Sequence, residues 1–319
     1  MHRIPVGVLG GSGYAGRELC ALIARHPRMR LVFATANERR GEQARLGGAD
    51  VRFVAHDDAP LSDAELVFSA LPHGASATWV ARVRGTGARA IDLSADLRPG
   101  NGPSDVPYGL TELVRRQLRD ATVVANPGCY PTAILMALVP LAKRGLIASG
   151  GTVNATAASG VTGAGLTART DLLFGEVTED FRAYGIANTH RHLAEMRAVL
   201  EGAGADADLI FTPHLLPVAR GILATITVPV TETIPDPLSP WRDEFAGEPF
   251  VEVTPEPPSL RDVVRRNVVR ISARYVAGVR QPTLLVLSAI DNLVKGAAGQ
   301  AVQNANVVLG LDEPMGLPT

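Results

Sequence analysis

The sequence has little cysteine, little excess charge and no long apolar run. Its two cysteines cannot build a disulfide framework, and reduced thiols are typical of a cytoplasmic protein. The formal net charge of −1 gives no reason to expect a nucleic acid or an anionic membrane as partner. The longest apolar run starts at Ala133, is broken by Pro140 and falls short of the roughly 18 residues that span a bilayer. The 46% of hydrophobic residues is enough for the cores of about two domains.

The first half of the chain alternates strand signals with helix signals. Short apolar runs occupy 6–9, 31–35, 66–70, 90–93 and 122–124, and a helix pattern runs over 17–25. Strands that alternate with helices predict an α/β fold with a doubly wound parallel sheet. We expect a Rossmann-type N-terminal domain (1–130), completed by a returning C-terminal helix (292–319), and an α+β catalytic domain (131–291). The Pro-rich segment 235–258 is expected to be a surface excursion.

A glycine-rich turn follows the first strand signal. Gly11, Gly13 and Gly16 match G-x-G-x-x-G between a strand and a helix, and Ser12 and Tyr14 lie in the same turn. These glycines allow a tight turn, the approach of a pyrophosphate and close packing of helix on strand. The position at the first strand–helix turn predicts a dinucleotide site, and an ordinary Gly-rich turn is the alternative.

The residues after the second strand bear on the choice of cofactor. An NAD site usually carries an acidic residue there, whereas this chain has Thr35–Asn37 followed by Glu38, Arg39 and Arg40. Arginine suits a 2′-phosphate, so Arg39 and Arg40 favour NADP. Glu38 could instead bind the ribose hydroxyl, and a solvated charge cluster without a ligand role is the remaining alternative.

Two further segments are expected on the cofactor side. Pro72 and His73 follow the strand at 66–70 and should lie at the carboxyl edge of the sheet, where ligands bind in such folds. A loop histidine without a role is an equally good interpretation of His73. A small-residue helix over 291–309 should return to the first domain and complete the cofactor pocket, with Asn292 among the contacts.

One cysteine stands at a predicted strand-to-helix turn. The sequence VVANPGCYPT at 123–132 leads from a strand to Cys129, and an apolar helix is expected from Thr132. Unpaired amides at a helix N-terminus favour the thiolate, so we predict that Cys129 is a nucleophile. A small buried hydrophobe is the alternative. The Cys129 amide or Asn126 could hold a tetrahedral oxyanion.

The second half carries the remaining polar candidates. Segment 159–165 predicts a flexible loop whose backbone donors could wrap a phosphate or an acyl group. The sequence HRHLAE at 190–195 places four polar side chains just before an amphipathic helix, and metal binding by His-x-His is the alternative, without support from a further Cys/His cluster. An acidic substrate needs cations, which arginines supply. The substrate-binding candidates are Ser159, Gly160, Arg191, Glu195 and Arg220.

These motifs together resemble the N-acetyl-γ-glutamyl-phosphate reductase family, a relative of aspartate-semialdehyde dehydrogenase. The resemblance rests on GGSGYAG at 10–16, NPGCYPT at 126–132, SGVTGAG at 159–165, HRH at 190–192, PHLLPVARGI at 213–222 and DNLVKGAAGQA at 291–301. It implies NADPH, no metal, arginine biosynthesis in the cytoplasm, and a homo-oligomer. It also implies that Cys129 is the nucleophile and that His190, or else His192, is the acid/base.

The chemistry of the residues agrees with that resemblance. A thiolate would attack an acyl phosphate and form a thioester, which accepts hydride more readily, while a histidine of near-neutral pKa would move the proton. Leu166, Leu193 and Ala194 depart from the family pattern on the substrate side, which leaves open a carrier-linked aminoadipyl phosphate of lysine biosynthesis. A metal-free alcohol dehydrogenase and a non-catalytic NADP sensor would not need Cys129.

Overall fold

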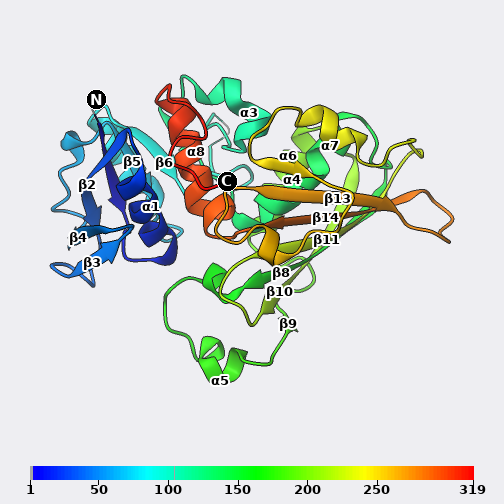
Figure 1. Cartoon of the computed structure of the whole chain (residues 1–319), viewed down its shortest axis with the longest axis horizontal. Coiled ribbons are helices and arrows are strands. Elements are labelled where there is room, and N and C mark those ends of the chain that lie inside the picture. The colour runs from blue at the N-terminus through cyan, green and yellow to red at the C-terminus, as the bar shows by residue number, and fades with distance from the viewer. Residues whose placement is uncertain (1–2, 104) are drawn as a thin grey trace. The chain divides into compact units, whose positions relative to one another are not determined.

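The computed structural model describes residues 3–103 and 105–319 and divides the chain into two compact units (Figure 1). The first unit comprises residues 1–128 and 297–318, and the second comprises residues 129–296 with Thr319. From the sequence, we expected the two domain boundaries after residues 130 and 291. No helix in the described part of the chain combines the length and the apolar character needed to cross a bilayer.

The first unit is a seven-stranded sheet with the order β3-β4-β2-β1-β5-β6-β7. Neighbouring strands pair in parallel, except for the antiparallel pair β3–β4 at one edge. The sequence missed that edge pair, because its half-exposed strands carry few apolar residues. The strands are β1 (Ile4–Leu9), β2 (Met29–Thr35), β3 (Gln43–Leu46), β4 (Ala49–Val54), β5 (Leu66–Ser69), β6 (Arg89–Asp92) and β7 (Val123–Ala125).

Helices cover both faces of this sheet, as expected for a doubly wound fold. Successive residues of β5 show the alternation: Leu66 and Phe68 join one apolar core with α1 and α8, whereas Val67 joins a second core with α2. The helices of the first unit are α1 (Tyr14–Arg25), α2 (Ser76–Gly85), α3 (Thr111–Leu118) and α8 (Gly299–Val308). Helix α8 packs on α1, α3 and β6, so the C-terminal segment belongs to the N-terminal unit.

The second unit is a mixed seven-stranded sheet with the order β12-β13-β14-β11-β8-β10-β9. The strands are β8 (Gly151–Gly160), β9 (Arg182–Ala183), β10 (Ala207–Leu216), β11 (Ile222–Pro229), β12 (Val251–Val253), β13 (Val269–Tyr275) and β14 (Thr283–Ile290). The helices are α4 (Cys129–Lys143), α5 (Phe174–Val177), α6 (His192–Gly202) and α7 (Ser239–Glu244). Short turns of helix are η1 (Leu61–Asp63) in the first unit, and η2 (Val161–Ala164), η3 (Thr170–Leu172), η4 (Leu260–Asp262) and the π-helical η5 (Val294–Ala298).

Helix α4 is the core of the second unit. It packs on β11, β13, β14, α6 and α7, and it is buried from Tyr130 to Ala142. Pro140 lies inside this helix and does not end it. A proline removes one helical hydrogen bond, and here the packing on all sides of α4 offsets that loss.

The Pro-rich segment 235–258 is more than a surface excursion. It contains α7, whose Trp241 is fully buried and donates from Nε1 to the carbonyl oxygen of Ala137 over 3.0 Å. It also contributes the edge strand β12, which pairs in parallel with β13. Aromatic burial therefore fixes the segment to α4, an effect that the proline content concealed.

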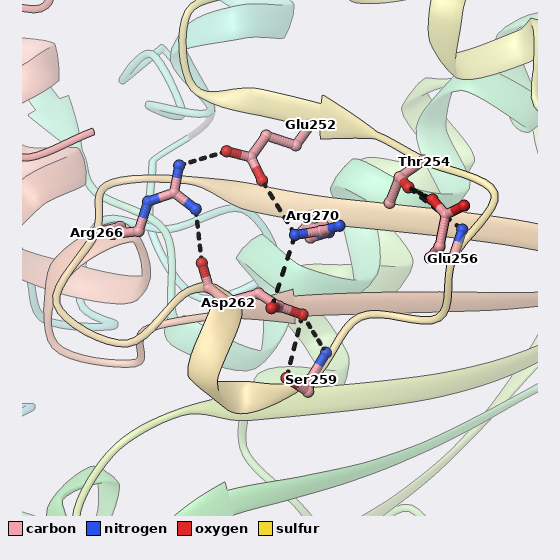
Figure 2. A network of polar contacts seen from close by, with 7 residues as sticks. All are labelled: Glu252, Thr254, Glu256, Ser259, Asp262, Arg266 and Arg270. Carbon is pink, nitrogen blue, oxygen red and sulfur yellow. Dashed lines mark hydrogen bonds and ion pairs between the residues drawn. The ribbon is translucent and has the colours of Figure 1, made fainter.

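A polar network ties β12 to η4 and β13 (Figure 2). Glu252 pairs with Arg266, and Glu252 and Asp262 lie 3.8 and 3.7 Å from Arg270. The Asp262 carboxylate also accepts the Ser259 backbone N–H over 2.7 Å, which closes a capping box. The network holds η4 beside the sheet, where Leu260 faces Gly221.

Candidate active site

The glycine turn of the first unit packs closely on helix α1 and leaves space before the start of that helix. Gly10 has φ +77°, and a Cβ on Gly16 would lie 2.1 Å from the Gly10 carbonyl oxygen, so α1 packs directly on the turn. Gly13 caps α1 without a side-chain hydrogen bond, and the nearest atom to a Cβ there is 3.9 Å away. Open space before a helix N-terminus fits an anion. Helix α1 begins at Tyr14 rather than at Arg17, which places Tyr14 in its first turn.

The loop after β2 is tied to the loop after β4. Asn37 Oδ1 accepts the His56 N–H over 2.8 Å, and His56 Nδ1 lies 2.6 Å from Thr35 Oγ1. Arg39 forms an ion pair with Glu42 at 2.6 Å, whereas exposed Arg40 has no side-chain partner among the described residues. The sequence reading missed His56. Its position after a strand parallel to β2 was the signal that could have found it.

The loop after β5 is held by hydrogen bonds from backbone N–H groups to the side chains of His73 and Asp96. Pro72 and His73 are exposed there, and His73 Nδ1 accepts the Ala95 N–H over 2.8 Å. The Asp96 carboxylate accepts the N–H groups of Gly74, Ser76 and Ala77 at 2.7–3.1 Å, which caps the start of α2. The loop therefore keeps a defined conformation at the carboxyl edge of the sheet.

Asn126 is fully buried in the first unit. Its Nδ2 donates to the Ala297 carbonyl over 3.2 Å, and its Oδ1 accepts from Asn304 Nδ2 over 2.9 Å. The buried Arg98, which the sequence reading missed, donates from Nε to the Asn126 carbonyl over 2.8 Å. These bonds fix the segment before Cys129, and an oxyanion role for Asn126 stays a prediction.

Cys129 is the first residue of α4, so the helix begins earlier than the expected Thr132. It is half-buried, whereas Cys20 is buried in α1, where burial raises the pKa of the Cys20 thiol to about 12. Gly296 lies against Cys129: a Cβ on Gly296 would be 2.8 Å from Cys129 Cβ and 3.2 Å from its Cα. Gly296 belongs to η5, a π-turn of the kind often found at functional sites.

A cluster of rings surrounds Tyr130, the residue after Cys129. The Tyr130 ring meets those of His190 and His192 edge to face, with centroids 5.6 and 6.1 Å apart. The Tyr184 hydroxyl donates to the Tyr130 hydroxyl over 2.9 Å. Burial raises the pKa of Tyr184 to about 12, and the charge of Cys129 contributes in the same direction. The structure thus gathers His190 and His192 around Tyr130, the residue after Cys129, and places Tyr184 against His190, contacts that were not predicted from the sequence.

His190 is neutral in this cluster. Burial, together with the nearby charge of Arg191, lowers the pKa of His190 to about 4. From the sequence we expected a near-neutral value, whereas the surrounding rings and the cation disfavour an imidazolium. A neutral imidazole can accept a proton from a thiol at neutral pH.

The polar candidates of the second unit occupy different environments. Ser159 and Gly160 are the last residues of β8 and not part of a flexible loop. A Cβ on Gly160 would lie 2.7 Å from the backbone nitrogen of Arg220. Arg191 is exposed, whereas Glu195 is fully buried in the first turn of α6. Of this group, the side chains of Arg191 and Arg220 are open to a ligand, whereas those of Ser159 and Glu195 are buried.

Arg220 is oriented by a buried carboxylate. Its Nη1 lies 3.5 Å from Oδ2 of Asp291, which also accepts the Arg265 backbone N–H over 2.7 Å. Arg265 itself has φ +67°, a conformation that costs energy in a non-glycine residue. Asp291 begins the motif at 291–301 but was assigned no role from the sequence; here it positions the cation expected to bind substrate.

Asn292 lies in the second unit. Its Oδ1 accepts the Gly221 N–H over 2.8 Å, and its Nδ2 donates to Thr162 Oγ1 over 2.9 Å. The chain returns to the first unit after Gly296. Contact of Asn292 with a cofactor stays a prediction. The described residues contain no group of three or more His, Cys, Asp or Glu suited to a metal ion.

Two family models match the chain, one for each unit. Residues 5–121 match the semialdehyde dehydrogenase NAD binding domain, and residues 129–292 match the semialdehyde dehydrogenase dimerisation domain. Among solved structures, the chain is similar to aspartate semialdehyde dehydrogenase II from Vibrio cholerae, with a TM-score of 0.79 and 20% identity over 97% of this chain and 99% of that one. It is also similar to the Candida albicans aspartate semialdehyde dehydrogenase with NADP, with a TM-score of 0.70 and 15% identity over 96% and 98%. These structures share the fold.

Full-length relatives narrow the family. N-acetyl-gamma-glutamyl-phosphate reductases from Ectopseudomonas mendocina and Halorhodospira halophila are each 41% identical to this chain, over 98% of both sequences. The reductase from Symbiobacterium thermophilum is 39% identical over 98% of this chain and 97% of its own. With these relatives matched along their whole length, the chain belongs to the N-acetyl-gamma-glutamyl-phosphate reductase family of the semialdehyde dehydrogenases.

Proposed function

We propose that the protein reduces N-acetyl-γ-glutamyl phosphate to N-acetyl-glutamate semialdehyde with NADPH, as a cytoplasmic homo-oligomer in arginine biosynthesis. One observation carries the proposal: Cys129 begins a helix directly before Tyr130, whose ring meets His190 edge to face, in a chain 41% identical to reductases of that name along its length. The dimerisation domain matched by residues 129–292 supports the assembly.

The first half of the reaction makes a thioester. Neutral His190 takes the proton from the Cys129 thiol, and the thiolate attacks the acyl carbon of the substrate. The carbon–sulfur bond forms, the carbon–oxygen bond to phosphate breaks, and phosphate leaves with the electron pair. Covalent catalysis divides one difficult reduction into two easier steps.

The second half releases the aldehyde. When bound, NADPH supplies a hydride for the thioester carbon. The thiohemiacetal that results collapses and the carbon–sulfur bond breaks. His190 can take the proton from the oxygen and return it to the sulfur. The Cys129 amide, at the start of α4, or Asn126 would stabilise the oxyanion. Arg191 and Arg220 would hold the anionic groups of the substrate.

The preference for NADP over NAD rests on Arg39 and Arg40. The loop after β2 has no acidic residue at Thr35–Asn37, and the open helix N-terminus at Gly13 fits the pyrophosphate that both cofactors share. Arg40 is free of side-chain partners in the described chain, so it can meet a 2′-phosphate without breaking an ion pair. Arg39 would first have to leave Glu42.

A single assay tests the substrate. NADP reduction should require inorganic phosphate and proceed with N-acetyl-glutamate semialdehyde, which is the reverse of the proposed reaction. The carrier-linked aminoadipate analogue is the alternative substrate, because Leu166 is exposed beyond η2 and Leu193 is buried in α6, where the family pattern differs. A higher kcat/KM with that analogue would overturn the proposed acyl group, and activity without phosphate would overturn the acyl-phosphate chemistry.

A further inference from the structure

A cavity of about 530 Å³ opens in the first unit between the start of β6, the end of α3 and the turn that follows α8. Helices α3 and α8 pack on one another there (Figure 1). Arg89, the first residue of β6, points to the same face of the sheet as Ile91, which packs in the apolar core with α8. The cavity therefore lies at the amino edge of the parallel strands, whereas the glycine turn and His73 follow the carboxyl ends of β1 and β5.

Three arginines and one carboxylate line this cavity, so its net charge is positive. Arg115 binds Glu313 in a fork, from Nε over 2.6 Å and from Nη2 over 3.2 Å. Gln303 Nε2 donates to the same carboxylate over 2.8 Å, which holds Glu313 against Arg115. Arg89 and Arg119 have no side-chain partner in the part of the chain that the structure describes. Two guanidinium groups are thus left for an anion from outside.

The end of α8 does not need these two cations. Helix carbonyls without partners attract basic side chains, which is the ordinary explanation for arginines at such a place. Here the carbonyl oxygens of residues 305–307 accept the N–H groups of Leu309, Gly310 and Leu311 at 2.8–3.1 Å. Gly310 has φ +66°, the left-handed conformation that commonly closes a helix. The backbone therefore closes α8 by itself, and Arg89 and Arg119 remain available.

We propose that this cavity binds a small organic dianion. Arginine recognises phosphate and carboxylate groups through charge-assisted hydrogen bonds, and two arginines from separate elements suit two negative charges. Buried Val307 and Val308 add an apolar wall beside these groups, which fits a ligand that also has an apolar body. Cavities that hold small molecules measure about 300–1,000 Å³, and this one lies within that range. A phosphate monoester and a dicarboxylate share the required chemistry.

Isothermal titration calorimetry at low ionic strength tests the site with two probes, phenyl phosphate and phthalate, without substrate or cofactor. Arg89→Ala with Arg119→Ala should weaken binding about 10-fold or more, the effect of losing one hydrogen bond to a charged group. Arg116→Ala is the matched control, because Arg116 is exposed in the last turn of α3 and does not line the cavity. Tighter binding of phenyl phosphate would identify a phosphate monoester as the ligand class, and tighter binding of phthalate a dicarboxylate.

Two results would overturn the proposal: neither probe binds the unmodified protein, or the double variant binds both probes as the control does. Arg119→Ala alone changes only an exposed side chain beyond the end of α3, so it keeps the test available if the double variant fails to fold. It should weaken binding in the same direction.

Hydrogen exchange of the unmodified protein locates the bound probe. The tighter probe should slow exchange of the amides of residues 307–311, which close α8 beside the cavity. Slower exchange confined to the glycine turn, residues 10–16, would place the anion at the expected cofactor contacts and refute the new site. Neither calorimetry nor exchange uses turnover, so the result is independent of the proposed reductase reaction.

Discussion

The two units prepare ligand contacts in different ways. In the first unit, the expected contacts come from the backbone of one turn, Gly10–Gly16, and the side chains leave space. In the second unit, they come from side chains on segments far apart in sequence: Cys129, His190 and Arg220. Backbone contacts need only a local conformation, whereas a side-chain cluster needs a complete fold. Changes in the second unit should therefore affect chemistry, and changes in the first should affect cofactor binding.

The largest difference between loss of activity and loss of cofactor binding is expected at Cys129. Cys129→Ser should abolish reductase activity, because a hydroxyl is a poorer nucleophile and leaving group at this position. NADPH binding, followed by the fluorescence of the cofactor, should remain, since the glycine turn is untouched. Cys20→Ala is the control that keeps activity. Residual activity within tenfold of the unmodified protein would contradict covalent catalysis.

The second largest effect is expected at His190. His190→Asn should lower the rate by about 10²–10⁴, the usual contribution of general acid–base catalysis, and His192→Asn should lower it less. Because burial and Arg191 lower the pKa of His190 to about 4, the group accepts protons above that pH and loses this ability as the pH falls below it. The acid limb of the kcat/KM profile should therefore lie near 4 and not at the usual histidine value. A worse effect in the His192 variant would reverse the assignment.

The third prediction concerns cofactor preference, which is expected to depend on Arg39 and Arg40 in the first unit. Arg39→Ala with Arg40→Ala should weaken NADPH and leave NADH nearly unchanged. A hydrogen bond to a charged group contributes about 1.5–3 kcal/mol, so one lost contact predicts roughly a 10- to 150-fold loss. Solvent screening and the competing Glu42 favour the lower end. Arg84→Ala, at the end of α2, is the control. Steady-state kinetics with both cofactors decides, and equal or better kcat/KM with NADH in the unmodified protein would refute the NADP assignment.

The smallest effect is expected at Gly296, whose backbone lies against Cys129 in the second unit. Gly296→Ala places a Cβ 2.8 Å from Cys129 Cβ, closer than such atoms approach in proteins, so the Cys129 side chain must shift. A misplacement of about 1 Å can cost 10²-fold, so we expect a loss of about 10-fold in turnover and in the alkylation rate of Cys129 by iodoacetamide. Gly47→Ala clashes with the Ala21 backbone in the first unit and controls for stability. Thermal unfolding should separate the two effects, and unchanged alkylation would refute the positioning role.

Local patterns of the sequence were sufficient for much of the first unit. Strands β1, β2, β5, β6 and β7 each coincide with a short apolar run, and the glycine turn needs only neighbouring residues to adopt its conformation. Cys129 could be placed at a strand-to-helix turn for the same reason. The antiparallel edge β3–β4 escaped prediction because its burial depends on pairing rather than on apolar content.

Only the tertiary structure decided the arrangement of the second unit. The Tyr130–Tyr184 hydrogen bond, the carboxylate of Asp291 behind Arg220 and the approach of Gly296 to Cys129 join residues that are 54, 71 and 167 positions apart. The low pKa of His190 also arises from packing, since it requires burial among rings that lie elsewhere in the sequence. The sequence by itself determined the chemical groups and their local turns, because backbone conformation depends on near neighbours. Their distances and charges depend on how the sheet and α4 pack, which no local pattern contains.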